Sequence, residues 1–166
     1  KQIVAMKRNG LQGLEIRNVD GTNVSDISLE KAEEVHKKLK EAGLIVWSIG
    51  SPIGKIGIGD DFEAHMAKFR HTLEVAKVLE CKNIRLFSFF MPGNEAPEKY
   101  HDEVIYRLKQ MVEAAKDSGI NLCHENEKDI YGDVAKRCLE IHKEVPELKG
   151  IFDPANFIQC GQDTVE

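Results

Sequence analysis

The chain lacks the features that mark membrane proteins and nucleic-acid-binding proteins. No hydrophobic run approaches the length of a membrane-spanning helix, and no signal-peptide pattern opens the sequence. No dense block of Lys and Arg is present, and the formal net charge is −5. Because neutralising nucleic-acid phosphates takes a basic surface, this balance argues against such a partner. We therefore expect a cytoplasmic protein that binds neither a membrane nor a nucleic acid.

Cysteine is also sparse, and its spacing excludes common structural roles. The four cysteines form no C-x-x-C pair, so the ligand spacing of a structural zinc site is absent. A chain of 166 residues with 42% hydrophobic residues buries a core without disulfides, and reduced thiols are expected. No linker or low-complexity tract divides the sequence, which predicts a single domain over residues 1–166.

What the sequence does contain is one recurrent pattern. An amphipathic helical run ends at a turn residue, and a short apolar segment then ends in polar residues. Ser28 is a predicted N-cap, Gly43 a predicted helix end, and Asp60 with Glu63 a predicted capping box. No two predicted strands are joined by a two-residue hairpin turn, so the pattern indicates a parallel sheet covered by helices. The predicted strands begin near residues 13, 44, 84, 120 and 148.

The polar residues choose between the two architectures that such a pattern allows. They follow each strand in turn: Arg17 and Asn18, Ser48 and Ser51, Ser88, Glu125 and Glu127, then Asp153 and Asn156. In an open doubly wound sheet only the strands at the switch point need polar ends. In a (β/α)8 TIM barrel every strand end borders one common mouth. The sequence therefore predicts the barrel.

The number of strands is short of a complete barrel, which has eight strands and about 250 residues. Only about five strands are predicted, and the sequence opens on a helix. We expect a partial barrel that lacks one strand at the start and two at the end, with a first residue, Lys1, that is not a native start. Its two edge strands are expected to be unpaired. A second copy of the chain or another partner is expected to cover them.

The Gly-rich segment SPIGKIGIGDD, residues 51–61, has neither G-x-G-x-x-G nor a G-K-[ST] ending. It is predicted to be a flexible loop over a site rather than a phosphate-binding loop. Away from the strand ends, the five histidines in helices are expected to be exposed or hydrogen-bonded. Trp47, Phe87, Phe89 and Phe90 are expected to pack in the core or at the rim.

Two carboxylates are the candidates for chemistry. Strand alternation places Glu125 and Glu127 on one face and His124 on the other, so His124 is expected to pack in the helix layer. If the first face points into the barrel mouth, Glu125 converges there with Asp153. A divalent cation between them would relieve the repulsion of the like charges. The other interpretation is that both carboxylates cap the following helices or pair with Arg17 or Lys128, and the pattern leaves both open.

Five motifs carry a family resemblance over nearly the whole chain. They are LEIRNVDG, WSIGSPIGKI, IRLFSFF, HENEKDIYGD and FDPANFIQCGQ. Together they resemble the sugar phosphate isomerase/epimerase group of the xylose isomerase-like TIM barrel superfamily. The resemblance implies a divalent metal ion (Mn, Mg or Zn) held by Glu, Asp, His and Glu from successive strands. It makes Glu125 the first ligand and Asp153 the second, with the other two beyond Glu166.

The same resemblance implies an aldose–ketose isomerase or keto-sugar epimerase that moves a proton through an enediolate. Glu125 would then also be catalytic, and Arg17, Glu127 and Asn156 would bind the substrate. Related epimerases often have His where Asn156 stands, and xylose isomerases have Lys where Glu127 stands. The sugar, and whether it carries phosphate, is therefore left undefined. Two alternatives stay open: a metal-dependent endonuclease of the same superfamily, and a non-catalytic sugar-binding barrel.

Overall fold

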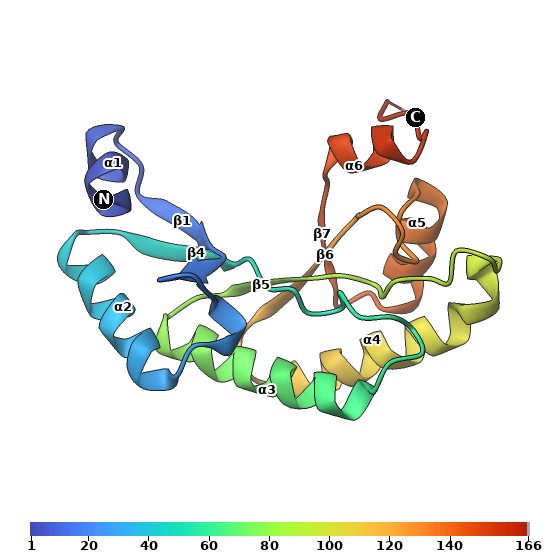
Figure 1. The fold of residues 1–166 in the computed structure, drawn as a ribbon, viewed down its shortest axis with the longest axis horizontal. Coiled ribbons are helices and arrows are strands. Elements are labelled where there is room, and N and C mark those ends of the chain that lie inside the picture. Colours follow the sequence, from blue (N-terminus) through green and yellow to red (C-terminus); the bar gives the residue numbers. More distant parts are fainter. Residues whose placement is uncertain (166) are drawn as a thin grey trace.

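The computed structural model describes residues 1–165 and contains one five-stranded sheet. Its strands are β1 (Gly13–Ile16), β4 (Ile45–Ile49), β5 (Asn83–Leu86), β6 (Asn121–Glu125) and β7 (Lys149–Ile151). The spatial order is β1-β4-β5-β6-β7, and every neighbouring pair is parallel. The sheet does not close, and the two termini lie on opposite arms of an open arc (Figure 1). The predicted partial barrel, with β1 and β7 as its edges, is confirmed.

Helices follow the strands as the alternating pattern predicts. They are α1 (Gln2–Arg8), α2 (Leu29–Glu41), α3 (Phe62–Val78), α4 (His101–Ala115), α5 (Ala135–Glu144) and α6 (Pro154–Gln159), with short 3-10 turns η1 (Val24–Asp26) and η2 (Pro97–Tyr100). Helices α2 to α5 line the outer side of the arc (Figure 1). None of the helices in the described residues is both long and apolar enough to cross a membrane.

The helix starts agree with the sequence at α2 but not at α3. Ser28 Oγ accepts a hydrogen bond from the Lys31 backbone amide at 3.2 Å, which confirms the predicted N-cap. The capping box predicted from Asp60 was wrong by one residue, because Asp61 is the N-cap and accepts from the Ala64 amide at 3.1 Å. The Asp60 carboxylate instead accepts from the backbone amide of Gly57 and closes the preceding turn.

A small antiparallel ribbon corrects the expectation that no hairpin is present. Strands β2 (Asn18–Val19) and β3 (Thr22–Asn23) are joined by Asp20 and Gly21 alone. Both linking residues have positive φ, +50° and +88°. Asp-Gly at the centre of a two-residue hairpin is the sequence that positive φ at both positions favours. The signal was present in the sequence, but the flanking strands are too short to show alternation.

The core lies between the outward faces of the strands and the covering helices. Its fully or nearly fully buried members include Ile84, Leu86, Leu122, Phe69, Leu73, Val104, Leu108 and Met111. Phe87 and Phe89 are buried as expected, whereas Trp47 is 65% exposed and its expected packing was wrong. The β1–β4 register jumps from Val46 to Ser48, so Trp47 is the extra residue of a β-bulge.

Candidate functional site

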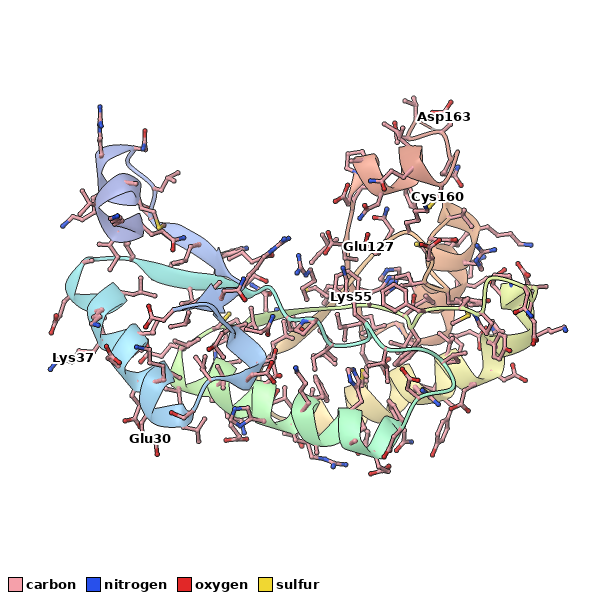
Figure 2. The ribbon with its side chains drawn as sticks, in the orientation of Figure 1. Glu30, Lys37, Lys55, Glu127, Cys160 and Asp163 are labelled. Atoms are coloured by element: carbon pink, nitrogen blue, oxygen red, sulfur yellow. The ribbon has the colours of Figure 1, made fainter. Side chains whose placement is uncertain are left out.

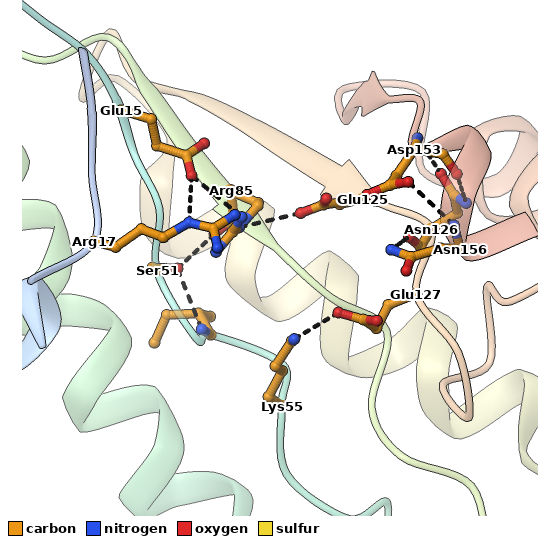
Figure 3. A network of polar contacts seen from close by, with 11 residues as sticks. Glu15, Arg17, Ser51, Lys55, Arg85, Glu125, Asn126, Glu127, Asp153 and Asn156 are labelled. Carbon is orange, nitrogen blue, oxygen red and sulfur yellow. Dashed lines mark hydrogen bonds and ion pairs between the residues drawn. The ribbon is translucent and has the colours of Figure 1, made fainter. Parts of the chain in front are cut away.

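Charged side chains from all parts of the sheet gather at the carboxyl ends of the strands (Figure 3). We call this set the mouth cluster: Glu15, Arg17, Lys55, Arg85, Glu125, Glu127 and Asp153. Glu15 and Arg85 lie within β1 and β5, and Glu125 ends β6. The carboxyl ends of parallel strands meet at one edge of the sheet, which is where barrel enzymes place their sites. Of the predicted polar strand ends, Arg17, Glu125, Glu127 and Asp153 converge here, whereas Ser88 contacts His124 on the helix side.

Arg85 is the centre of the mouth cluster. Its side chain is 9% exposed, its Nη1 lies 3.2 Å from Glu15 Oε1, and its Nε lies 3.2 Å from Glu125 Oε2. The second contact brings the charges together without hydrogen-bond geometry, so Arg85 Nε and Glu125 Oε2 are both buried without a hydrogen-bond partner. Arg17 Nε donates to the same Glu15 oxygen at 2.8 Å, and this contact raises the pKa of Arg17.

Glu125 is a carboxylate held largely out of water. It is 8% exposed at the end of β6. Desolvation raises its pKa above the usual value, the positive charge of Arg85 opposes that rise, and the charge of Asp153 adds to it. A desolvated carboxylate with an unsatisfied oxygen is well suited to binding a cation or accepting a proton.

Asp153 begins α6. Its Oδ1 accepts hydrogen bonds from the backbone amides of Ala155 at 2.8 Å and Asn156 at 3.1 Å, so the side chain is the N-cap of the helix. In Figure 3 the Glu125 carboxylate extends to Arg85 and the Asp153 carboxylate turns to α6. The sequence left open whether the two carboxylates share a metal ion or instead form helix caps and ion pairs. In the structure Asp153 caps a helix and Glu125 forms an ion pair. The partner of Glu125 is Arg85, not Arg17 or Lys128.

Two asparagines fix the position of this cap. Asn126 Oδ1 accepts from the Asp153 backbone amide at 2.7 Å, and Asn126 Nδ2 donates to the Asp153 carbonyl at 2.8 Å. Asn156 Nδ2 donates to the Asn126 carbonyl at 2.9 Å. Asn156 is predicted to bind substrate; in the structure it is 9% exposed and its amide joins α6 to the end of β6.

Glu127 pairs with a residue that is distant in sequence. Lys55 Nζ donates to Glu127 Oε2 at 2.6 Å and lies 4.3 Å from the centre of the Phe87 ring. Figure 2 shows Lys55 and Glu127 on the concave side of the arc, between its two arms. The predicted substrate-binding residue Glu127 thus lies in the mouth cluster, together with Arg17.

The segment that carries Lys55 is tied down, contrary to the expected flexible loop. The carbonyls of Ile53 and Gly54 accept hydrogen bonds from the amides of Phe87 and Phe89, and the Gly54 amide donates to His65 Nε2 at 2.8 Å. Gly54 has φ +87°, and a Cβ there would lie 1.9 Å from the Phe87 carbonyl oxygen. Only glycine permits this approach, which holds Lys55 over the end of β5.

His124 faces away from the mouth cluster, as predicted. Ser88 Oγ accepts from the Gly132 amide at 2.8 Å and lies 3.0 Å from His124 Nε2. The ring is buried, which lowers the pKa of His124 to about 3. Three of the helix histidines have polar partners: His65 accepts from the Gly54 amide, His71 Nε2 lies 2.8 Å from the Ile27 carbonyl, and His101 Nδ1 lies 2.9 Å from Asp102 Oδ1.

Four residues of this region were missed by sequence reasoning. Glu15, Lys55, Arg85 and Asn126 all make contacts that shape the site. Arg85 could have been found, because a charged residue between Ile84 and Leu86 must by alternation face away from the helix layer. Lys55 had no comparable signal, since it lies in a Gly-rich segment 72 positions from its partner.

The carboxylates fit part of a divalent-metal site. Oxygen ligands suit Mg²⁺ and Mn²⁺, Glu125 Oε2 has no hydrogen bond, and both capping bonds to Asp153 use Oδ1. No group of three or more His, Cys, Asp or Glu side chains that would hold a metal is present among residues 1–165. Glu125 and Asp153 would supply two ligands of a larger set, and both that role and their sharing of one ion stay predictions.

A curved five-stranded parallel sheet with helices on its outer side and charged residues at the carboxyl ends of its strands has the arrangement of part of a (β/α)8 barrel (Figure 1). The chain belongs to the xylose isomerase-like TIM barrel family, whose model matches residues 3–166. The resemblance found in the sequence motifs is confirmed. No curated protein matches the chain.

Solved structures share the fold at low sequence identity. The probable 3-DHS dehydratase AsbF of Bacillus anthracis superposes with a TM-score of 0.79 and 21% identity over 98% of this chain and 60% of its own. The IOLI protein, solved with a zinc atom, superposes with a TM-score of 0.77 and 14% identity over 98% of this chain and 60% of its own. The 3-keto-D-glucoside 4-epimerase YcjR of E. coli superposes with a TM-score of 0.73 and 18% identity over 95% of this chain and 64% of its own. The chain spans about three fifths of the length of these proteins.

Proposed function

We propose that the whole protein is a divalent-metal-dependent isomerase or epimerase of a small sugar or sugar phosphate. The observation that carries this proposal is the state of Glu125. Its carboxylate ends β6 at the barrel mouth, is 8% exposed, and has an oxygen without a hydrogen bond. Asp153 lies two residues past the end of the neighbouring strand β7, so the two carboxylates follow adjacent strands at the same edge of the sheet.

The chemistry asks for one group that takes a proton and others that hold hydroxyls. A base removes the hydrogen from the carbon beside the carbonyl. The C–H electron pair then forms a C=C bond, and the carbonyl oxygen gains the charge of an enediolate. Returning the proton to the former carbonyl carbon gives the isomer, with the hydroxyl proton moving from the old hydroxyl oxygen to the former carbonyl oxygen. Returning it to the opposite face of the original carbon gives the epimer. The raised pKa of Glu125 suits this proton transfer. A divalent ion held by Glu125 and Asp153 would polarise the carbonyl and stabilise the developing charge.

The polar residues around Glu125 would orient the substrate. Arg17 is 61% exposed at the mouth, and its guanidinium is within reach of a ligand hydroxyl. Glu127 is partly exposed beside Lys55. We propose both as substrate contacts, together with Asn156 near the cap of α6.

Three structurally similar proteins are compatible with this chemistry. YcjR is an epimerase of a keto sugar, and IOLI was solved with zinc. AsbF is a probable dehydratase. The endonuclease alternative has less support, because it would use several histidines at the strand ends and His124 of β6 faces the helix layer.

The test is exchange of the substrate's α-hydrogen with deuterated water, run on the full-length protein with Mn²⁺ across ketoses and their phosphates. Glu125→Gln should lower exchange by at least about a hundredfold, the usual scale for a lost acid or base. Glu113→Gln, on the exposed face of α4, is the control and should change nothing. Exchange that persists in Glu125→Gln, or that needs no metal, refutes the mechanism. Cleavage of abasic DNA without sugar exchange would establish the endonuclease.

A further inference from the structure

Two cationic side chains of the mouth cluster share one aromatic ring. Lys55 Nζ lies 4.3 Å and the Arg85 guanidinium carbon 5.2 Å from the centre of the Phe87 ring. Phe87 is 1% exposed and directly follows β5, so the ring is a fixed support for both cations. The backbone bonds that hold the Gly54 segment fix the start of the Lys55 side chain as well. The two charges therefore occupy defined positions on the concave side of the sheet.

Each of the two cations is paired with a carboxylate, and each pair can be broken when a metal ion or a ligand binds. Arg85 is paired with Glu125, and its buried Nε has no hydrogen-bond acceptor. If Glu125 turns to a metal ion, as the proposed function requires, Arg85 keeps its ion pair with Glu15 and its contact with the Phe87 ring. Lys55 pairs with Glu127 at side-chain exposures of 33% and 24%, where water and ligands compete for the contact.

The charge of the mouth cluster points to the sign of the ligand. Its three cations and four carboxylates, all ionised, sum to −1, and a bound divalent ion would reverse this to +1. A neutral sugar makes no use of that charge. A negatively charged group on the substrate would meet Lys55 and, once Glu125 has turned to the metal, the side of the Arg85 guanidinium that Glu125 has left.

We propose that the substrate is an acidic sugar, whose carboxylate or phosphate is bound by Lys55 and Arg85 while its hydroxyls face Glu125 and Asp153. This inference rests on the proposed function, for which it names the class of substrate. Lys55 is its specificity-determining residue, because its side chain approaches the mouth from the Gly-rich segment and not from a strand. The anion replaces Glu127 at Lys55 and Glu125 at Arg85.

The test is isothermal titration of the full-length, Mn²⁺-loaded protein with gluconate, glucose 6-phosphate and sorbitol. At least one of the two anions should bind about tenfold or more tightly than sorbitol, since hydrogen bonds to charged groups are among the strongest. Preference for gluconate assigns a carboxylate, and preference for glucose 6-phosphate a phosphate. Lys55→Met should remove most of the preference, whereas Glu127→Gln should strengthen anion binding by freeing Lys55.

The control is Lys68→Met. Lys68 has the same 33% side-chain exposure as Lys55 and also pairs with a carboxylate, Asp26, but it lies on α3 outside the mouth cluster. Equal affinity for sorbitol and the anions, binding of none of the three, or equal effects of Lys55→Met and Lys68→Met would overturn the inference. Anion binding that depends on Lys55 without any hydrogen exchange would leave the inference standing and remove the isomerase. If neutral sugars exchange hydrogen as fast as acidic ones, the isomerase stands and the acidic substrate class is refuted.

Discussion

Arg85 Nε lies 3.2 Å from Glu125 Oε2, and neither atom makes a hydrogen bond although both are buried. The pair is therefore held by charge attraction, with the further contact of Arg85 to Glu15. An ion pair in this state stabilises the fold only while both partners are present, because either charge left alone in a buried position is costly.

Arg85→Met should accordingly lower the free energy of unfolding of the metal-free protein by about 3–5 kcal/mol, since it leaves Glu125 unpaired. Adding Glu125→Gln to this variant should recover part of the loss by removing the stranded charge. Urea unfolding of the two single variants and the double variant measures the coupling. Additive effects of the two substitutions would show that the contact carries no energy.

Asp153 has two roles that substitution separates. Asp153→Ala removes both the helix cap and the carboxylate, and should cost about 0.5–2 kcal/mol of stability. Asp153→Ser keeps an acceptor oxygen for the α6 amides and should stay close to the wild type in urea unfolding. Both variants should lose Mn²⁺ affinity in titrations of the full-length protein. Retained affinity in Asp153→Ser would remove Asp153 from the ligand set.

Gly54 tests the support of the Lys55 segment. Gly54→Ala forces a positive φ on a residue with a Cβ and places that Cβ against the Phe87 carbonyl, so a loss of at least about 2 kcal/mol is expected. Gly59→Ala, in the same segment, meets no atom within 4 Å and should change stability by less than about 0.5 kcal/mol. Thermal unfolding of the two variants compares them directly, and equal melting temperatures would contradict the described packing.

His124 gives the stability a pH dependence. Its pKa is about 3 in the folded protein against 6.5 for an ordinary histidine, so between these values the unfolded chain binds a proton that the folded chain does not. Stability from this group is therefore present above pH 6.5 and falls as the pH drops, by up to about 1.4 kcal/mol per pH unit. His124→Gln lacks this dependence. Urea unfolding from pH 7 to pH 4 should show the wild type losing its advantage, and parallel curves would contradict a neutral buried His124.

The elements were predictable where local pattern and topology agree. Each strand of the main sheet is a short apolar run after a helix, and parallel connections leave few possible strand orders, so β1, β4, β5, β6 and β7 fell where expected. The cap at Asp153 also had a local signal, because Asp followed by Pro is typical of an N-cap and first helical residue. The hairpin of Asp20 and Gly21 was missed because its strands have only two residues each.

The partners within the mouth cluster were less accessible to sequence reasoning. The choice of Arg85 over Arg17 as the partner of Glu125 depends on how three strands are staggered, which no local pattern reports. The bulge at Trp47 shifts that stagger by one residue. The pairing of Lys55 with Glu127 depends on the course of a loop between β4 and α3.

The side chain of Asn126 presents a donor and an acceptor to the backbone of Asp153, as a peptide group of a neighbouring strand does. These two side-chain hydrogen bonds therefore continue the pairing of β6 with β7 past the last residue of each strand. Aspartate at this position would lack the donor, and glutamine would be one methylene too long for the same spacing. The backbone of Asp153 is thus held in position by sheet-like hydrogen bonds, although this residue follows β7 and caps α6.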